Sequence, residues 1–211
     1  SKGKHVFVEK PLAMNEVEAN LMIAAAEKNN VQLMVGHLLQ YHPIFKTVLK
    51  MVKNEDIGEI NYIYSNRLSF GKVRSEEDVI WSFAPHDISM ILSLTGQEPE
   101  LVRTESASIL QSNIADTATV HMAFTSGLKA HIFVSWLHPY KEQKLVVIGE
   151  SAMAVFDDTQ PWEQKLACYG LIINWIKYSQ VITKTKNSYI FAMYLPAVIS
   201  LLDTFALIRV I

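Results

Sequence analysis

Lys10 is the first residue whose position suggests chemistry. It stands in the tripeptide Glu9-Lys10-Pro11, directly after the apolar run 5–8. Ligands of open parallel sheets bind beyond the carboxyl ends of the strands, and Pro11 biases the residue before it toward an extended backbone. An ammonium group held there could donate a hydrogen bond to a hydroxyl and stabilise negative charge developing on its oxygen. The alternative is a solvated ion pair with Glu9.

His86 is the second candidate. It follows Pro85 in the stretch 84–96, where apolar residues recur at helical spacing and Gly96 closes the pattern. Because proline is favourable in the first turn of a helix, this stretch predicts a helix that opens at His86. The helix dipole disfavours imidazolium at that end, and a neutral ring can accept a proton near pH 7. Asp87 acts in the opposite direction, so the net pKa shift is open, and a structural histidine is the alternative.

The other polar residues show no spacing typical of a metal site or of a serine nucleophile. The sequence contains no HxH, HExxH or CxxC motif and no GxSxG elbow. His37, His42 and His86 are too loosely spaced to indicate metal ligands, so we expect no metal. The histidines that lie within or at the end of strand-like runs are expected to be sheet residues: His121, His131 and His138.

A strand–helix–strand unit would position Lys10. Residues 5–8 predict a short buried strand, and Asn15 followed by Glu18 predicts a helix that starts with a capping box. Residues 31–36 predict a second short strand, and this order is typical of a parallel sheet. Only one such unit is present, and the sequence contains no GxGxxG motif. The apolar residues on one face of the predicted helix are Val17, Leu21, Ala24 and Ala25.

A different kind of domain would position His86. After Gly36, residues 42–54 predict an amphipathic helix, residues 59–70 a strand, and residues 84–96 the helix of His86. Successive β-rich runs then follow without helices between them, which predicts an antiparallel sheet. These runs are residues 101–110, 117–137, 144–149 and 152–158.

The composition is that of a globular protein and excludes several functions. Of the 211 residues, 50% are hydrophobic and 19% are charged, and the formal net charge is −2. This balance does not favour a nucleic-acid or basic membrane-binding surface. Cys168 is the single cysteine and cannot form an internal disulfide, so we expect a reducing, cytoplasmic environment. Ser1 and the absence of a leader lead us to expect a cut N-terminus.

Three stretches together resemble the glucose–fructose oxidoreductase/inositol dehydrogenase (Gfo/Idh/MocA) family. They are "GKHVFVEKPLA", "VGHLLQYHPIFKTVLKMVKNEDIGEI" and "WSFAPHDISMIL", and the resemblance covers about residues 1–165. It implies an α/β fold, in which the end of a Rossmann domain (one βαβ unit) precedes an α+β domain with a large, mostly antiparallel sheet. It also implies that about the first 90 residues of the Rossmann domain, with its glycine loop, are missing.

The resemblance assigns catalytic roles to Lys10 and His86. Glu9, Lys10 and Pro11 match the family's EKP loop, where a cis bond often precedes the proline. Lys10 would lie between nicotinamide and substrate, and His86 would be the base on the substrate hydroxyl. Family members often carry an aspartate where Ser82 stands here, which leaves Lys10 and His86 as the working pair.

Five further residues are expected to bind the substrate: His37, Tyr41, His42, Arg67 and Arg74. The sequence around the two arginines resembles the branch of the family that acts on nucleotide sugars, such as UDP-N-acetylglucosamine 3-dehydrogenases. The paired N–H donors of an arginine guanidinium group match the geometry of a diphosphate. Exposed strand and loop charges are the alternative for both arginines.

The predicted function is oxidation of a secondary hydroxyl of a sugar with NAD or NADP as cofactor. The substrate would be a small sugar, nucleotide-linked; a free polyol or inositol dehydrogenase and a non-catalytic sheet domain are the alternatives. We expect a homodimer or homotetramer that pairs through the strands 117–124, 131–137 and 144–149, without nucleic acid or membrane. The residue that chooses between NAD and NADP lies on a strand that this sequence lacks.

The predicted domains are residues 1–36 (the Rossmann remnant), 37–167 (the substrate and oligomerisation domain) and 168–211 (a divergent apolar tail). Asp203 is the one acidic residue after Glu163, which suggests a tail altered by a frameshift. Residues 188–202 carry no charge, but a membrane span needs about 20 apolar residues. A buried helix or strand, or a tail foreign to the fold, are the alternatives.

Overall fold

The computed structural model describes residues 2–71 and 73–170. These residues belong to one compact unit. The predictions about the uncharged stretch 188–202 and most of the tail fall outside the described residues.

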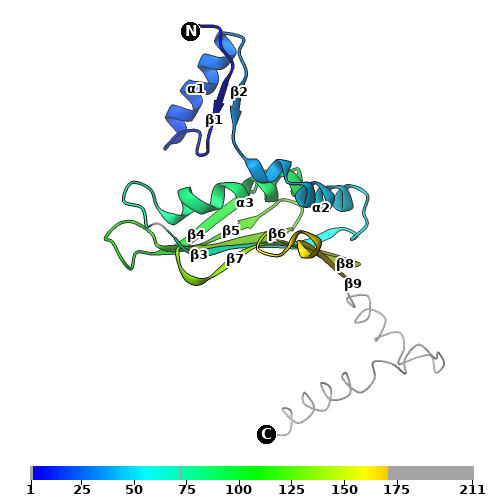
Figure 1. The fold of residues 1–211 in the computed structure, drawn as a ribbon. Helices are drawn as coiled ribbons and strands as arrows, with labels where there is room; N and C mark the ends of the chain where they lie inside the picture. The colour runs from blue at the N-terminus through cyan, green and yellow to red at the C-terminus, as the bar shows by residue number, and fades with distance from the viewer. Residues whose placement is uncertain (1, 72, 171–211) are drawn as a thin grey trace, which may run out of the picture. The chain divides into compact units, whose positions relative to one another are not determined.

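The N-terminal segment is a strand–helix–strand unit, as predicted (Figure 1). Strand β1 (Val6–Val8) pairs in parallel with β2 (Leu33–Val35), and helix α1 (Glu16–Lys28) connects them. Asn15 caps α1 because its side chain accepts a hydrogen bond from the Glu18 backbone N–H at 2.9 Å. This cap fixes the start of the helix where the sequence indicated it.

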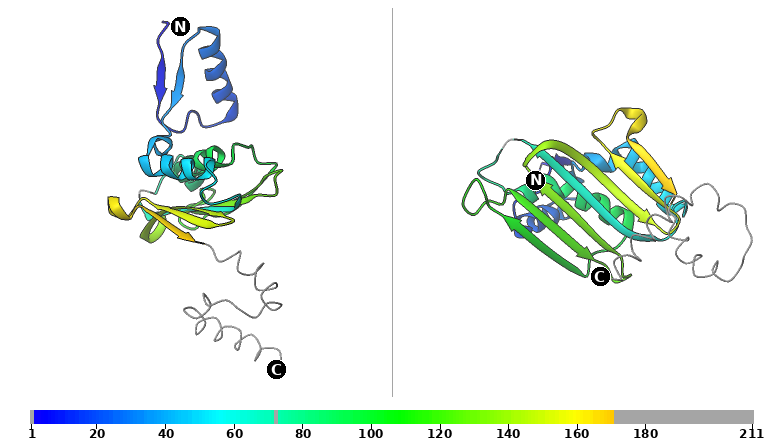
Figure 2. Two further views of the ribbon diagram at one scale, coloured as in Figure 1. Left: turned by 90° about the vertical axis from the view of Figure 1, so that its right-hand side faces the viewer. Right: turned by 90° about the horizontal axis from the view of Figure 1, so that it is seen from below.

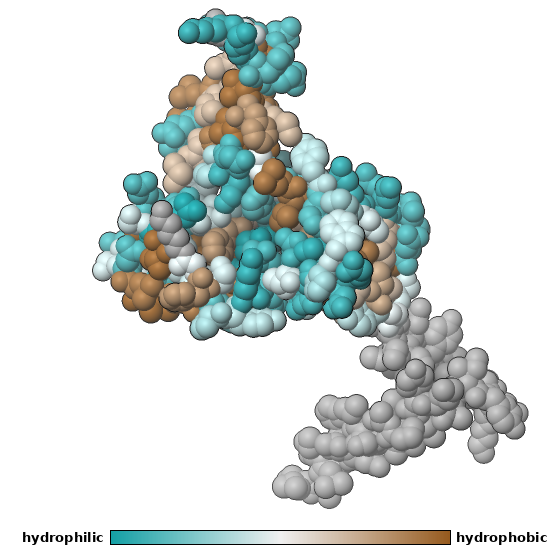
Figure 3. All heavy atoms as spheres, viewed as in Figure 1, coloured by the Kyte–Doolittle hydropathy of each residue, from teal (hydrophilic) through white to brown (hydrophobic). Residues whose placement is uncertain are grey.

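The prediction that the first strand is buried is wrong for this chain. Phe7 is 56% exposed, and no residue of α1 is buried. The apolar helix residues Val17 and Leu21 are 70% and 66% exposed. The reason is that, among the described residues, β1 and β2 pair only with each other. Figure 3 shows the resulting concentration of hydrophobic side chains over this segment.

Two α-helices and two short 3-10 helices follow β2 in the described residues, and the second 3-10 helix is η2 (Trp162–Gln164), close to their end. The 3-10 turn η1 (Leu38–Tyr41) leads into α2 (Pro43–Lys53), and α3 (Val79–Thr95) contains His86. Helix α3 begins five residues before the predicted start at residue 84, because Asp78 accepts a hydrogen bond from the Trp81 backbone N–H at 2.9 Å and caps the helix there. Pro85 therefore lies inside the helix, and the prediction that His86 opens it is wrong.

A seven-stranded sheet forms the second layer, in the order β4-β5-β6-β3-β7-β8-β9. Only β3 and β6 pair in parallel, and the other neighbours are antiparallel. The mostly antiparallel sheet is thus confirmed, with one parallel pair that the sequence did not indicate. The strands are β3 (Ile60–Phe70), β4 (Leu101–Ala107), β5 (Thr117–Ala123), β6 (Lys129–Ser135), β7 (Leu137–Gly149), β8 (Ala152–Asp157) and β9 (Leu166–Gly170).

The helices α2 and α3 lie on one face of this sheet, and the core is between the two layers (Figure 2). Phe45 from α2, Ile91 from α3 and Ile132 from β6 are each fully buried there. No α-helix of the described residues covers the other face. None of the described helices has both the length and the apolarity needed to cross a membrane.

A buried carboxylate holds the loop before β5. Asp116 is fully buried and accepts a hydrogen bond from the Trp136 indole N–H at 2.6 Å. Its other oxygen accepts from the backbone N–H groups of Ile109 and Leu110, at 2.6 and 2.7 Å. These bonds compensate for the burial of the charge and fasten the loop to the start of β5.

Candidate active site

Lys10 lies directly beyond β1 and reaches α3. Its Nζ donates a hydrogen bond to the main-chain carbonyl of Ser82, and the Lys10–Pro11 peptide bond is cis. Burial lowers the pKa of Lys10 from its ordinary value, Glu77 raises it, and Arg74 and Arg67 lower it further. The carbonyl that receives Lys10 belongs to the residue four positions before His86, so both side chains approach the same segment of α3.

His86 is half-buried on α3 and neutral at pH 7. Burial lowers its pKa to about 4, Arg67 and Lys10 add to this effect, and Asp87 opposes it. The sequence left the direction of this pKa shift open. Desolvation and two cations, not the helix dipole, keep the ring neutral, because His86 is in the interior of the helix. A neutral imidazole can accept a proton from a hydroxyl.

His37 is the third member of the cluster. It follows β2, and its ring stands edge-on to that of His86, with centroids 6.1 Å apart and an interplanar angle of 87°. Burial and the nearby Lys10 charge lower the pKa of His37. The Nδ1 atoms of both rings are enclosed and have no hydrogen-bond partner within the described part of the chain. The structure therefore brings together Lys10, His37 and His86.

A buried ion pair adjoins the cluster. Arg67 on β3 donates to Asp87 through Nε at 2.6 Å and through Nη2 at 3.2 Å, and Ser65 donates to the same carboxylate at 2.5 Å. Asp87 is 1% exposed. The sequence did not reveal this pair, since its members are 20 residues apart. Two of the five N–H donors of Arg67 are occupied, so its predicted contact with a phosphate would rest on the remaining N–H groups of Nη1 and Nη2.

The other predicted substrate-binding residues have contacts of their own. Arg74 pairs with Glu77 at 2.8 Å and is close enough to Lys10 to affect its pKa. Tyr41 is 57% exposed. His42 caps α2 by accepting from the Ile44 N–H at 3.2 Å, and its Nε2 lies 3.7 Å from Asp158. Their roles in binding stay predictions.

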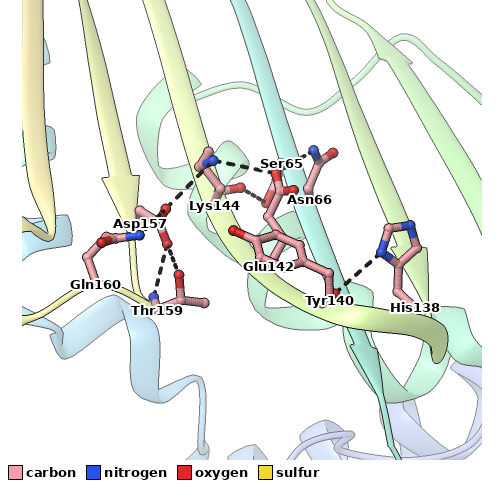
Figure 4. A network of polar contacts seen from close by, with 9 residues as sticks. All are labelled: Ser65, Asn66, His138, Tyr140, Glu142, Lys144, Asp157, Thr159 and Gln160. Carbon is pink, nitrogen blue, oxygen red and sulfur yellow. Dashed lines mark hydrogen bonds and ion pairs between the residues drawn. The ribbon is translucent and has the colours of Figure 1, made fainter.

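A second polar network lies on the sheet (Figure 4). Lys144 on β7 lies 3.7 Å from Glu142 and 3.6 Å from Asp157, and Asn66 donates to Glu142 at 2.9 Å. Ser65 donates to the Lys144 carbonyl at 3.1 Å. Ser65 thus links this network to Asp87. His, Cys, Asp and Glu side chains nowhere form a metal-binding group of three within residues 2–71 and 73–170.

Comparison with known proteins defines the class. Residues 45–155 match the GFO/IDH/MocA C-terminal domain, and residues 1–37 match the oxidoreductase family with an NAD-binding Rossmann fold. The chain therefore belongs to the GFO/IDH/MocA family of oxidoreductases, as the sequence motifs predicted.

Individual relatives cover a range of named activities. The chain is 31% identical over 134 residues to UDP-N-acetylglucosamine 3-dehydrogenase of Acidithiobacillus ferrooxidans, which is 63% of this chain and 41% of that protein. It is 26% identical over 168 residues to myo-inositol 2-dehydrogenase of Thermotoga maritima, or 74% and 50% of the two chains. The chain thus spans about half the length of the curated relatives it matches.

Solved structures agree on the fold. A crystal form of the A. ferrooxidans UDP-N-acetylglucosamine 3-dehydrogenase superposes with a TM-score of 0.68 at 27% identity, covering 79% of this chain and 53% of that one. An inositol dehydrogenase homolog from Azotobacter vinelandii, complexed with NADH and myo-inositol, gives 0.70 at 19% identity and covers 80% and 50%. This second likeness concerns the fold alone.

Proposed function

We propose that this chain is the substrate-binding part of an NAD(P)-dependent oxidoreductase that oxidises a secondary hydroxyl of a nucleotide-linked sugar. The observation that carries the proposal is the placement of Lys10 and a neutral His86 at one segment of α3. Family membership and the named activities of the relatives support it. The proposed domains remain residues 1–36, 37–167 and 168–211; β9 continues to Gly170, three residues past the second boundary.

The residues present fit the nicotinamide end of the cofactor only. Glu9, Lys10 and Pro11 follow a parallel strand at its carboxyl end, where such ligands bind, and Lys10 offers a cation there. No GxGxxG turn exists in the sequence to hold a pyrophosphate. Bound NAD(P)+ would supply the hydride acceptor, and the choice between NAD and NADP stays open.

The chain's own residues would handle the hydroxyl group. Hydride leaves a carbinol carbon as its hydroxyl proton is withdrawn, so a base must lie within about 3 Å of that oxygen. His86 can accept the proton because its pKa of about 4 leaves the ring unprotonated at pH 7. Lys10 can donate to the same oxygen and stabilise the forming alkoxide. The Ser82 carbonyl holds the ammonium group in place.

The nucleotide would be held by arginine. Arg74 is 48% exposed in its side chain, and its partner Glu77 leaves other guanidinium donors free for an oxyanion. Arg67 could contribute Nη1. A free polyol or inositol dehydrogenase is the second candidate, since the T. maritima relative aligns over the longer stretch.

Activity is best tested in a restored protein. We define it as this chain with a glycine-rich NAD-binding Rossmann segment fused before residue 2. Reduction of NAD(P)+ would be followed with UDP-N-acetylglucosamine, with myo-inositol and without sugar. Turnover with the UDP-sugar alone supports the proposal, and turnover with inositol alone favours the second candidate. Turnover with neither sugar in a folded, cofactor-binding protein would favour a non-catalytic sheet domain.

A further inference from the structure

The facing rings of His37 and His86 carry an unexplained feature. The Nδ1 atom of each ring is buried and has no hydrogen-bond partner among the described residues. Buried polar atoms in proteins are nearly always paired, directly or through ordered water. Two such atoms on rings whose centroids are 6.1 Å apart therefore point to a shared interaction.

The other charged groups around His86 cannot accept a proton from it. Lys10 and Arg67 are donors only. Asp87 has both oxygens engaged, by two bonds from Arg67 and one from Ser65. Ser82 stands where the family often has an aspartate, and its carbonyl already receives Lys10. Of the groups that influence the His86 charge, His37 alone is left with an unoccupied acceptor nitrogen.

The chemistry also requires an onward acceptor. An imidazolium with a pKa of about 4 does not retain a proton at pH 7. The Nδ1 atom of His86 is enclosed by protein. The His86 ring would therefore turn Nε2 toward a substrate and Nδ1 toward His37. A separation too long for a direct hydrogen bond is commonly spanned by one water.

We propose that His37 receives, directly or through one bridging water, the proton that His86 removes from the substrate. The inference rests on the proposed function. The hydroxyl O–H bond breaks as an N–H bond forms at His86 Nε2, and the Nδ1–H bond of His86 then breaks as one forms at His37 Nδ1. His37 is half-buried and releases a proton from its other nitrogen to solvent. Both rings end neutral, and exchange with water resets their tautomers.

His37 thus acts through His86 and does not touch the reacting atoms. This differs from its predicted role in binding the sugar, and the two roles separate experimentally. A binding residue affects KM, whereas a proton acceptor affects turnover and its dependence on solvent protons.

The first experiment uses the 211-residue chain itself and needs no activity. Nitrogen NMR of the histidine rings would report their tautomers and titration midpoints in the parent, His37→Asn and His37→Phe. We expect complementary tautomers in the parent. His37→Phe should lower the His86 midpoint, because a neutral acceptor on the imidazolium N–H favours the charged form, and His37→Asn, whose amide oxygen can still accept, should lower it less. A folded variant with His86 tautomer and midpoint unchanged would overturn the inference. His138→Gln, on a half-buried histidine of β7, is the control.

The second experiment measures turnover in the restored protein. We expect His37→Phe to reduce turnover ~10-fold or more, within the range of general acid–base effects, with KM changed less than about threefold. The solvent deuterium isotope effect on turnover should be larger in His37→Phe than in the parent, and added imidazole should restore part of the turnover of this variant. A raised KM with unchanged turnover would assign His37 to binding and reject the relay. An inactive parent would reject the proposed function, while the NMR coupling would still establish the ring contact.

Discussion

Replacing Asp87 with asparagine tests the buried ion pair next to His86. Asp87 is 1% exposed, and the Arg67 side chain is 12% exposed. The substitution leaves the guanidinium in a buried position without its counter-charge. It also replaces one carboxylate oxygen with an amide N–H₂ group, which cannot accept the hydrogen bonds that Arg67 and Ser65 donate to Asp87.

The expected loss is large because one partner of a buried pair is removed. Such changes cost about 3–5 kcal/mol in the free energy of unfolding. For a unit of this size, about 2–4 °C of melting temperature corresponds to each kcal/mol, so Asp87→Asn should melt about 10 °C lower. Urea unfolding of the 211-residue chain at pH 7 would give both the midpoint and the slope.

Two further variants make the test specific. Asp56→Asn changes an exposed aspartate and should stay within about 0.5 kcal/mol of the parent. Arg67→Met combined with Asp87→Leu removes both charges, and it should recover most of the loss because apolar replacements of a whole buried pair are often neutral. A loss below about 1 kcal/mol for Asp87→Asn alone would refute the reasoning.

Four other outcomes are expected. In the restored protein, Lys10→Met or His86→Asn should lower turnover roughly 100-fold or more with a smaller change in KM, because the lost contacts are strongest in the transition state. Lys50→Met is the control. If both Lys10→Met and His86→Asn kept turnover within a few fold of the parent, neither residue would take part in the chemistry. The turnover profile should lose activity as pH falls through about 4, where His86 becomes protonated; a midpoint near 6.5 would contradict this. The 211-residue chain should bind NAD(P) weakly or not at all because it lacks the glycine turn, and micromolar affinity by calorimetry would disagree. The helix-free sheet face should pair two or four copies, so Tyr64→Arg should shift sedimentation toward monomer, and a parent that is already monomeric at micromolar concentration would exclude the pairing.

Acid unfolding gives one more expectation, for Asp116. Burial alone would raise the pKa of this carboxyl, but hydrogen bonds from the Leu110 and Ile109 backbone and from Trp136 hold it below its usual value. A depressed pKa contributes stability above the unfolded value of about 3.9 that is lost as pH falls through the folded value. Asp116→Asn should therefore lower the urea midpoint at pH 7 and flatten its decline below pH 4; an unchanged acid profile would argue against this linkage.

The order of elements was readable from sequence because it depends on local periodicity and caps. Asn15 and Glu18 marked the start of α1, and β-rich runs without helices between them indicated the antiparallel sheet. The start of α3 was missed because Pro85 resembles a first-turn proline. Asp78 caps the helix earlier, and the helix continues through the proline.

The partners of the site residues could not be read from sequence. Arg67 and Asp87 meet because β3 and α3 lie against each other, and nothing in the local pattern pairs them. The parallel contact of β3 with β6 is likewise a consequence of tertiary structure. By contrast, Lys10 and His86 could be proposed from sequence because a strand end and a family motif each have chemical meaning on their own. That the Lys10 ammonium group reaches the Ser82 carbonyl, one turn of α3 before His86, required coordinates.

The parallel pair β1–β2 has a consequence for how such a protein can be assembled. Among the described residues each strand has one neighbour, so each also presents an outer row of backbone donors and acceptors. A further strand can add to such an edge without rearranging the pair. The β1–β2 pair is therefore suited to complementation in trans, in which a separately expressed glycine-rich half, mixed with this chain, would add a strand to this edge. The same edge would serve as a split site for building a two-piece reporter of cofactor binding.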